Sequence, residues 1–329
     1  MQKLLTIVVP VYKVEPYINK CLDSCILADE KLMSQLEVII VNDGTPDNSA
    51  EMSREYVKRY PQTFRQIDKE NGGHGSAWNV GLKEATGKYL RFLDSDDWLT
   101  NLDQLMEDLA TCEADLVFTH INRYYADKDS NLLERIDDEY NVVKSLSVFD
   151  FTKNGQPYIM DFWFATYKRS ILTYNEKIFA EHTMYDDAIL FVLPAVRAKN
   201  YVCFDYVVYN YFIGRVGQSV VQERTPKNII ARSKQCLYMD KFWRENRPID
   251  IDANVEKGIV SIISNNAWFI FSDALVLPYK DVRRIEKEMS HIFQYRSIPT
   301  KSYRRYKELP FFLFYLVNKC RQWLGRTNK

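Results

Sequence analysis

The chain has 329 residues, of which 46% are hydrophobic and 14% aromatic, so it can bury a large core and is too long for one minimal domain. The number of lysines and arginines equals the number of aspartates and glutamates. This zero net charge gives no indication of a nucleic-acid-binding protein. The charge is nevertheless uneven, because residues 300–329 carry eight lysines and arginines against Glu308 alone. We therefore expect this segment to have a separate role.

The first hundred residues alternate between strand and helix patterns. Continuously apolar runs predict buried strands, and the segments between them have helical spacing. Such alternation predicts a parallel sheet with helices on both faces. The predicted strands are residues 4–12, 36–43, 64–69 and 88–94, and the predicted helices are residues 15–27, 48–60 and 74–86.

The pattern changes along the rest of the chain. A helix at 98–112 and a strand at 114–119 continue the alternation, and the polar residues 122–141 indicate a loop or an edge excursion. From about residue 225 the pattern is helical. Three helices are predicted there, at residues 227–245, 253–275 and 279–293.

The six cysteines form no C-x-x-C pair and have no histidine at zinc-site spacing, and Cys21 and Cys25, one helical turn apart, suit packing better than a disulfide. We interpret all six as reduced thiols of a cytoplasmic protein. Lys3 and the apolar run after it resemble a signal peptide only superficially, since the run is short and contains Pro10. No segment has the roughly 18–20 apolar residues that a membrane-spanning helix requires.

The stretch "FLDSDDWL" places Asp94 at the end of a predicted strand and Asp96 and Asp97 directly after it. One interpretation is a solvated turn in which Asp96 and Asp97 cap the next helix. The other is a divalent-cation site, because hard cations take carboxylate oxygens as ligands. Asp43 ends another predicted strand, and ligands of parallel sheets bind beyond the carboxyl ends of the strands. This convergence favours the cation site.

Several familiar sites are excluded by spacing. An EF-hand beginning at Asp94 would need glycine and glutamate where the chain has Leu99 and Leu105. No phosphate-binding P-loop pattern is present. The pair Gly73-x-Gly75 lacks the third glycine of a dinucleotide fingerprint.

Four stretches occur in an informative order: "TIVVPVYKVEPYINKCLDS", "VIIVNDGTPDNS", "NGGHGSAWNVGLKEATGKYLRFLDSDDW" and "YDDAILF". Together they resemble the family 2 glycosyltransferases that build bacterial surface polysaccharides, from residue 5 to roughly residue 220. The resemblance implies a GT-A fold, which is an α/β fold with a Rossmann-like, mixed, mostly parallel sheet flanked by helices. It also implies a nucleotide-sugar-binding and catalytic domain at 1–222, followed by a helical region at 223–329 with a basic amphipathic tail.

The resemblance implies roles for residues near the nucleotide. Pro10 and Tyr12 would line the base pocket, and Asp43 would accept a hydrogen bond from the base, an arrangement typical of uracil. Asp94, Ser95 and Asp96 would form the D-x-D motif.

In that motif Asp96 would contact a Mn²⁺ or Mg²⁺ ion, and Asp94 would contact the ion or the ribose. The cation would neutralise the nucleotide diphosphate as it leaves. We interpret Asp97 mainly as a cap of the next helix. It would also help to position the part of the site that binds the diphosphate or the acceptor.

The stretch "YDDAILF" matches the motif whose aspartate serves as general base in this family. That aspartate falls on Asp187, and Asp186 replaces the usual glutamate. The base would take the proton of the acceptor hydroxyl as it attacks the anomeric carbon. The alternative is an acidic N-cap for the helix that follows.

The resemblance implies roles for four further residues, although the chain departs from the family pattern near one of them. Trp78 stands where the family often has an arginine, and His74 would compensate by donating to the phosphates. Arg215 and Ser219 follow the segment where relatives place a loop over the diphosphate. Trp163 would stack on an acceptor sugar, with core packing as the alternative.

The stretch "ELPFFLFYLVNKCRQWLGR" at 308–326 places aromatic residues among cations. This pattern is typical of an interfacial helix on the inner face of an anionic cell membrane. The alternative is a helix that docks on the protein's own core or on a partner chain.

The residues and the resemblance together predict a metal-dependent, inverting glycosyltransferase that moves a sugar from a nucleotide-sugar donor, expected to be a UDP-sugar, to a hydroxyl of a glycan or lipid-linked acceptor. Two alternatives remain: a non-catalytic nucleotide-sugar-binding or scaffold protein on the same fold, and a sugar nucleotidyltransferase. A nucleotidyltransferase would need a loop rich in glycine and arginine after the first strand, where this chain has "VYKVEPY".

Overall fold

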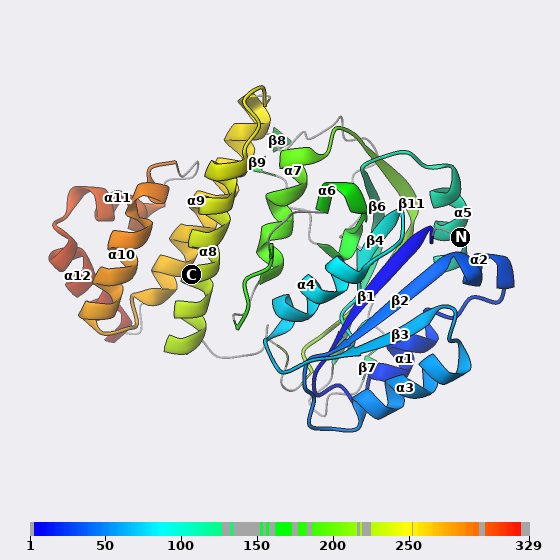
Figure 1. Cartoon of the computed structure of the whole chain (residues 1–329). Helices are drawn as coiled ribbons and strands as arrows, with labels where there is room; N and C mark the ends of the chain where they lie inside the picture. The colour runs from blue at the N-terminus through cyan, green and yellow to red at the C-terminus, as the bar shows by residue number, and fades with distance from the viewer. Residues whose placement is uncertain are drawn as a thin grey trace. The chain divides into compact units, whose positions relative to one another are not determined.

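In the computed structural model the chain folds into two compact units (Figure 1). Unit 1 comprises residues 1–150 and 160–222, and unit 2 comprises residues 151–159 and 223–329. The structure describes residues 3–126, 132–133, 152–153, 156–157, 162–172, 177–182, 186–215, 218, 225–251, 253–295 and 300–323.

Unit 1 is built on one mixed sheet with the strand order β3-β2-β1-β4-β10-β6-β11-β5, and β7 pairs with the last two residues of β6. Strands β3, β2, β1 and β4 run parallel, and so do β6 and β11, whereas β10 is antiparallel to both its neighbours. The strands are β1 (Leu5–Val11), β2 (Leu36–Asn42), β3 (Phe64–Asp68), β4 (Tyr89–Phe92), β5 (Trp98–Leu99), β6 (Leu116–Ala126), β7 (Leu132–Leu133), β10 (Ala165–Lys168) and β11 (Tyr201–Ile213).

Helices cover this sheet. Helix α4 packs against β1 and β2, and α3 packs against β3 and α1 (Figure 1). The helical segments of unit 1 are α1 (Ile18–Asp23), α2 (Glu30–Gln35), α3 (Ser49–Arg59), α4 (His74–Glu84), α5 (Leu102–Thr111), α6 (Arg169–Leu172) and α7 (Leu193–Arg197), with short 3-10 helices η1 (Phe162–Phe164) and η2 (Asp186–Phe191). The predicted α/β sheet with flanking helices is confirmed.

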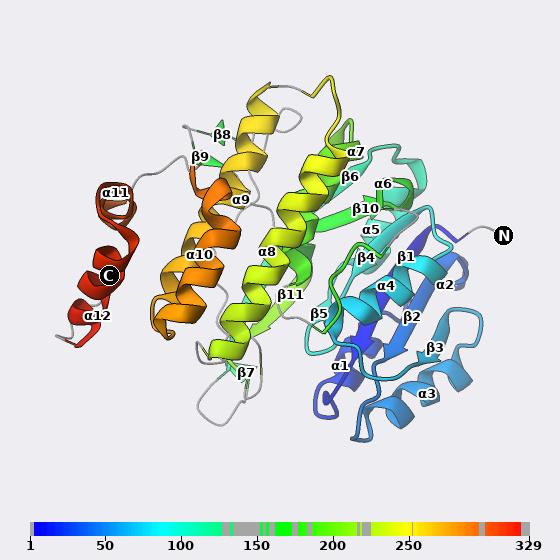
Figure 2. The same ribbon diagram turned by 60° about the vertical axis from the view of Figure 1, so that its left-hand side comes forward.

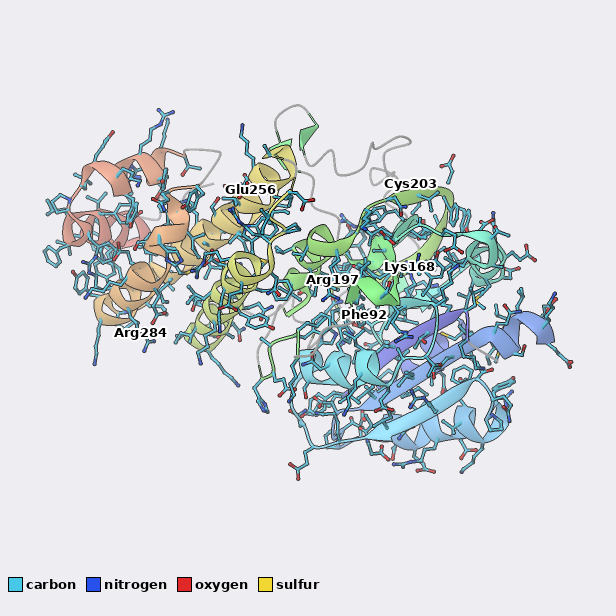
Figure 3. The ribbon with its side chains drawn as sticks, turned by 45° about the horizontal axis from the view of Figure 1, so that its top comes forward. Phe92, Lys168, Arg197, Cys203, Glu256 and Arg284 are labelled. Atoms are coloured by element: carbon cyan, nitrogen blue, oxygen red, sulfur yellow. The ribbon has the colours of Figure 1, made fainter. Side chains whose placement is uncertain are left out.

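The core of unit 1 fixes the position of α4 on the sheet, and with it the end of the loop that precedes the helix. At Gly81 a β-carbon would meet Cγ1 of Val8 at 2.2 Å, so the helix lies as close to β1 as its backbone allows. Trp78 of α4 is fully buried and stacks on Phe92, which Figure 3 labels, with ring centroids 4.3 Å apart. Phe179 packs edge-on against both rings.

Strand β6 and helix α1 differ from the elements predicted from the sequence. Residues 122–126, predicted as loop or edge excursion, continue β6, because they pair in parallel register with β11 from Asn122 to Tyr125. This long-range pairing outweighs their polar composition. The helix predicted at 15–27 is shorter, since α1 covers only Ile18–Asp23. Residues 134–141 lie outside the described residues.

Unit 2 contains the three predicted helices, α8 (Pro226–Asn246), α9 (Ala253–Ala274) and α10 (Tyr279–Phe293), which lie side by side (Figure 2). Two shorter helices follow, α11 (Lys301–Glu308) and α12 (Phe311–Trp323). A small hairpin of β8 (Thr152–Lys153) and β9 (Gln156–Pro157) contacts α9. Aromatic rings on α9 to α12 form the core of this unit, chiefly Trp268, Phe271, Phe293, Tyr303, Tyr306 and Phe314.

None of the described helices is long and apolar enough to cross a bilayer. The six cysteines are free thiols, as predicted.

Candidate active site

Three carboxylates converge directly after β4. Asp94, Asp96 and Asp97 each offer one oxygen atom, and these atoms lie within 4.8 Å of one another. Only 25% of the Asp94 side chain and 9% of the Asp96 side chain are exposed, and Asp97 is buried. Like charges this close and this poorly solvated repel one another and are stable only with compensating partners.

Asp97 is held by β11. Its Oδ2 accepts a hydrogen bond of 2.6 Å from the Tyr209 hydroxyl, and its Oδ1 accepts one of 2.7 Å from the Phe212 backbone N–H. Burial raises the pKa of Asp97 well above its usual range, and the charges of Asp96 and Asp94 raise it further, against the effect of these two hydrogen bonds. Asp97 therefore ties the end of β4 to β11.

The prediction that Asp97 caps the next helix is wrong. Helix α5 begins at Leu102, and its N-cap residue is Asn101, which makes no side-chain capping bond. The short strand β5 lies between the aspartates and that helix. Pairing of β5 with β11 moves the helix start away from the acidic turn.

Asp96 has a cationic partner. Its Oδ2 accepts a charge-assisted hydrogen bond from Nε of Arg215, at 2.5 Å. Burial raises the pKa of Asp96 and so does the charge of Asp94, whereas Arg215 lowers it. The Arg215 guanidinium also lies over the ring of Tyr17, 5.2 Å from its centroid. Arg215 thus places positive charge where Asp96 would hold a metal ion.

Asp94 pairs with the loop before α4. Its Oδ1 and Nε2 of His74 are hydrogen-bonded at 3.0 Å, and the His74 ring lies 4.2 Å from the buried ring of Trp78. Trp78, at the position of the expected arginine, therefore packs in the core and positions the histidine. The backbone N–H of Asp94 donates to the Tyr209 hydroxyl at 3.2 Å.

These aspartates fit a hard divalent cation. The donor set is all carboxylate oxygen, which suits Mg²⁺ or Mn²⁺. Both Asp97 oxygens already accept protein hydrogen bonds, so Asp94 and Asp96 are the residues that would hold the ion. The guanidinium of Arg215 occupies one oxygen of Asp96, which is consistent with a position that attracts positive charge.

Asp43 lies at the same edge of the sheet. Its backbone N–H donates to the Val11 carbonyl, so the ends of β1 and β2 are joined there. The carboxylate accepts hydrogen bonds from Nζ of Lys69 at 2.5 Å and from the backbone N–H groups of Gly72 and Gly73 at 2.9 and 2.8 Å. Asp43 therefore orders the loop that leads to His74.

Pro10, Tyr12 and Ser95 lie close to these groups along the chain. Pro10 is buried within β1, opposite Val41 in the register, and Tyr12 directly follows the strand with 43% of its surface exposed. Ser95 is buried between the two aspartates of the D-x-D motif. Ser219 lies outside the described residues.

A second group of residues shares the tyrosines of β11. Trp163 stacks on Tyr211 with ring centroids 4.2 Å apart, and the buried Arg91 holds the Trp163 carbonyl through its guanidinium at 2.5 Å. Burial raises the pKa of Tyr211, and the charges of Asp97, Asp94, Asp96 and Asp187 raise it further, in that order. Asp187, in η2, thus lies within electrostatic reach of the same tyrosine as the acidic cluster.

Sequence reasoning missed the residues that hold this site together, namely Lys69, Arg91, Tyr209 and Tyr211. Lys69 had a local signal, because it ends a predicted strand as Asp43 does. Tyr209 and Tyr211 alternate along "VVYNYFI", the period of a strand, but nothing in the sequence links them to Asp97 or Trp163.

The family model described as "Glycosyl transferase family 2" matches residues 6–174. The chain belongs to this family. It is 31% identical over 216 residues to the uncharacterized glycosyltransferase EpsJ of Bacillus subtilis. This match covers 64% of this chain and 61% of EpsJ. It is 25% identical to the minor teichoic acid biosynthesis protein GgaB of the same organism, over 92% of this chain and 36% of GgaB. The chain therefore spans less than two thirds of either relative.

Residues 1–349 of S. aureus TarS, solved in complex with UDP-GlcNAc, have a similar fold. The TM-score is 0.54 at 14% sequence identity, and the match covers 93% of this chain and 92% of the TarS chain. This likeness confirms the predicted GT-A fold.

We predict that Tyr209→Phe lowers the free energy of unfolding by about 1–3 kcal/mol, because it leaves a buried Asp97 oxygen without its donor. Urea unfolding followed by circular dichroism measures the change. The matched control is Tyr206→Phe on the same strand, whose hydroxyl donates to the less buried Asp108. Equal losses in the two variants would contradict the role given to Asp97.

Proposed function

We propose that the chain is a metal-dependent, inverting glycosyltransferase that uses a UDP-sugar donor. The observation that carries the proposal is the cluster of Asp94, Asp96 and Asp97 at the carboxyl end of β4, flanked by Arg215 and His74. A nucleotide-sugar has a diphosphate with negative charge to neutralise and a leaving group to stabilise. Acidic residues that hold a cation, beside two cationic or proton-donating side chains, suit that task.

In this proposal Asp94 and Asp96 hold Mn²⁺ or Mg²⁺, which supplies the positive charge that stabilises the departing diphosphate. Arg215 would exchange its bond to Asp96 for a phosphate oxygen, and His74 would do the same from Asp94. Both exchanges keep a charge-assisted hydrogen bond. Ser95 lies between the two ligands, and Ser219 is proposed to contact the same diphosphate.

Asp43 is proposed to recognise the base. An ionised carboxylate has about four lone-pair positions, and three are used by Lys69, Gly72 and Gly73, so one remains for the N–H of uracil. Tyr12, exposed at the end of β1, and Pro10 before it are proposed to line the base pocket. TarS binds UDP-GlcNAc on a similar fold, which is consistent with a uridine donor.

Asp187 is proposed as the general base. The acceptor hydroxyl would attack the anomeric carbon, its proton would pass to the Asp187 carboxylate, and the bond to the diphosphate would break on the opposite face. One displacement of this kind inverts the configuration and forms no covalent intermediate. Trp163, whose ring stacks on Tyr211, is proposed to contact the acceptor sugar.

The acceptor is proposed to be a glycan or lipid-linked hydroxyl of a bacterial surface polysaccharide, since GgaB is a teichoic acid biosynthesis protein. Residues 1–222 are proposed to carry the donor site and the catalysis. A cytoplasmic location is proposed with this function, because nucleotide-sugars are made there.

We predict that Asp96→Ala weakens Mn²⁺-dependent binding of UDP by at least about 10-fold without unfolding the protein, because Asp96 lies at a strand end. Isothermal titration with UDP, with and without Mn²⁺, measures the loss, and GDP and dTDP serve as comparison ligands. The control is Asp103→Ala, an exposed aspartate on α5.

Unchanged Mn²⁺-dependent affinity in the Asp96 variant would overturn the metal site. Tighter binding of GDP or dTDP than of UDP would overturn the base assignment and leave the metal site standing.

We predict that Asp187→Asn lowers the transfer rate by about 10²–10⁴-fold, the usual contribution of a positioned base. The loss should fall on kcat more than on KM, because the proton moves only on the way to the transition state. The assay follows UDP release and glycan product with the UDP-sugar that wild type uses fastest. Asp205→Asn, at an exposed aspartate of β11, is the control. Near-normal transfer by Asp187→Asn would show that Asp187 is not the general base.

A further inference from the structure

The exposed face of α12 is apolar. Among the described side chains of α12, the exposed ones are those of Phe312, Leu313, Leu316, Cys320 and Trp323. The first three are 53%, 48% and 39% exposed, and Trp323 is 87% exposed. Their spacing places them on one side of the helix, since they follow steps of three and four residues. A helix of a globular unit normally shows the opposite pattern, with charged residues outward.

This helix is fixed to unit 2 by its other side. Phe314 is fully buried and stacks on Phe271 of α9. The Tyr315 hydroxyl donates to the Leu277 carbonyl at 3.0 Å. The exposed apolar side chains are therefore presented by a packed helix and not by a loose end.

The apolar surface continues beyond α12. The ring of Tyr279, at the start of α10, lies 5.6 Å from the ring of Phe312 and is itself 38% exposed. Val276 is 46% exposed, and its carbonyl accepts a hydrogen bond from Nζ of Lys319 at 2.7 Å. Two separate segments of the chain thus build one surface, which we call the α12 patch: Val276, Tyr279, Phe312, Leu313, Leu316, Cys320 and Trp323.

Cations lie near the α12 patch along the chain. Residues 301–323 contain six lysines and arginines and one acidic residue, Glu308, in a chain whose net charge is zero. On α11 the side chains of Lys301, Arg304 and Lys307 are exposed. On α12 itself, Lys319 and Arg321 are partly exposed, and the helical spacing places Lys319 at the border of the apolar face.

We propose that the α12 patch docks onto the surface of an anionic lipid bilayer. Apolar and aromatic side chains on one face, bordered by cations, match the boundary between acyl chains and acidic headgroups. A helix of 13 residues is about 20 Å long, too short to cross a hydrocarbon core of about 30 Å, so α12 lies in the interface. The cations decide between a lipid surface and a second copy of the chain, because two identical basic faces repel each other. This inference stands independently of the proposed catalytic function.

The test measures sedimentation of the full chain with vesicles of phosphatidylcholine alone and of phosphatidylcholine containing phosphatidylglycerol. We expect binding to the anionic vesicles that weakens as salt is raised. The apolar variant Leu313→Ser/Leu316→Ser/Trp323→Ser and the charge variant Arg304→Gln/Lys307→Gln should each lose at least about tenfold in partition to these vesicles. Both sets of side chains are exposed, so thermal unfolding should be unchanged.

Matched controls come from the same unit. Phe269→Ser removes an aromatic side chain that is 58% exposed on α9, and Lys241→Gln/Lys257→Gln removes two exposed cations from α8 and α9. Both controls should bind as wild type does. Equal vesicle binding by all variants would overturn the proposal. It would also be overturned by a concentration-dependent dimer of wild type, detected by light scattering, that the apolar variant abolishes.

Discussion

The central constraint on unit 1 is the charge of three carboxylates gathered at the end of β4. Asp94, Asp96 and Asp97 lie too close and too deep for water to screen them fully. Each has a different partner: a histidine for Asp94, an arginine for Asp96, and a hydroxyl with a backbone N–H for Asp97. Removing any one of these partners would leave a buried or half-buried carboxylate without its compensating bond, which costs several times more than an exposed ion pair contributes.

The partners come from segments far apart in the chain, so the charge cluster organises the sheet edge around it. Tyr209 and Phe212 bring β11 against the end of β4, and the same strand carries Tyr211 to Trp163. Asp43 orders the loop that carries His74. The proposed donor site and the proposed acceptor side are thus joined by one strand, which suits a reaction that needs two substrates held in line.

Local patterns in the sequence predicted the alternating strands and helices, the aspartates at the strand ends and the three long helices of unit 2. These predictions depend on short-range periodicity and on the general property of parallel sheets that the carboxyl ends of their strands lie at the same edge. The pairing of β6 with β11, the hydrogen bond from Tyr209 to Asp97 and the ion pair of Arg215 with Asp96 were not predictable in this way. Each joins residues roughly a hundred positions apart, and only the folded sheet brings them together.

The most direct test of the account is an anomalous-diffraction map of crystals of this chain grown with Mn²⁺ and UDP. We predict a manganese peak bound by Asp94 and Asp96, with Arg215 turned from Asp96 to the diphosphate and Asp97 still hydrogen-bonded to Tyr209. A manganese peak elsewhere, or UDP bound at this edge of the sheet while Arg215 remains on Asp96 and no manganese is present, would contradict the account.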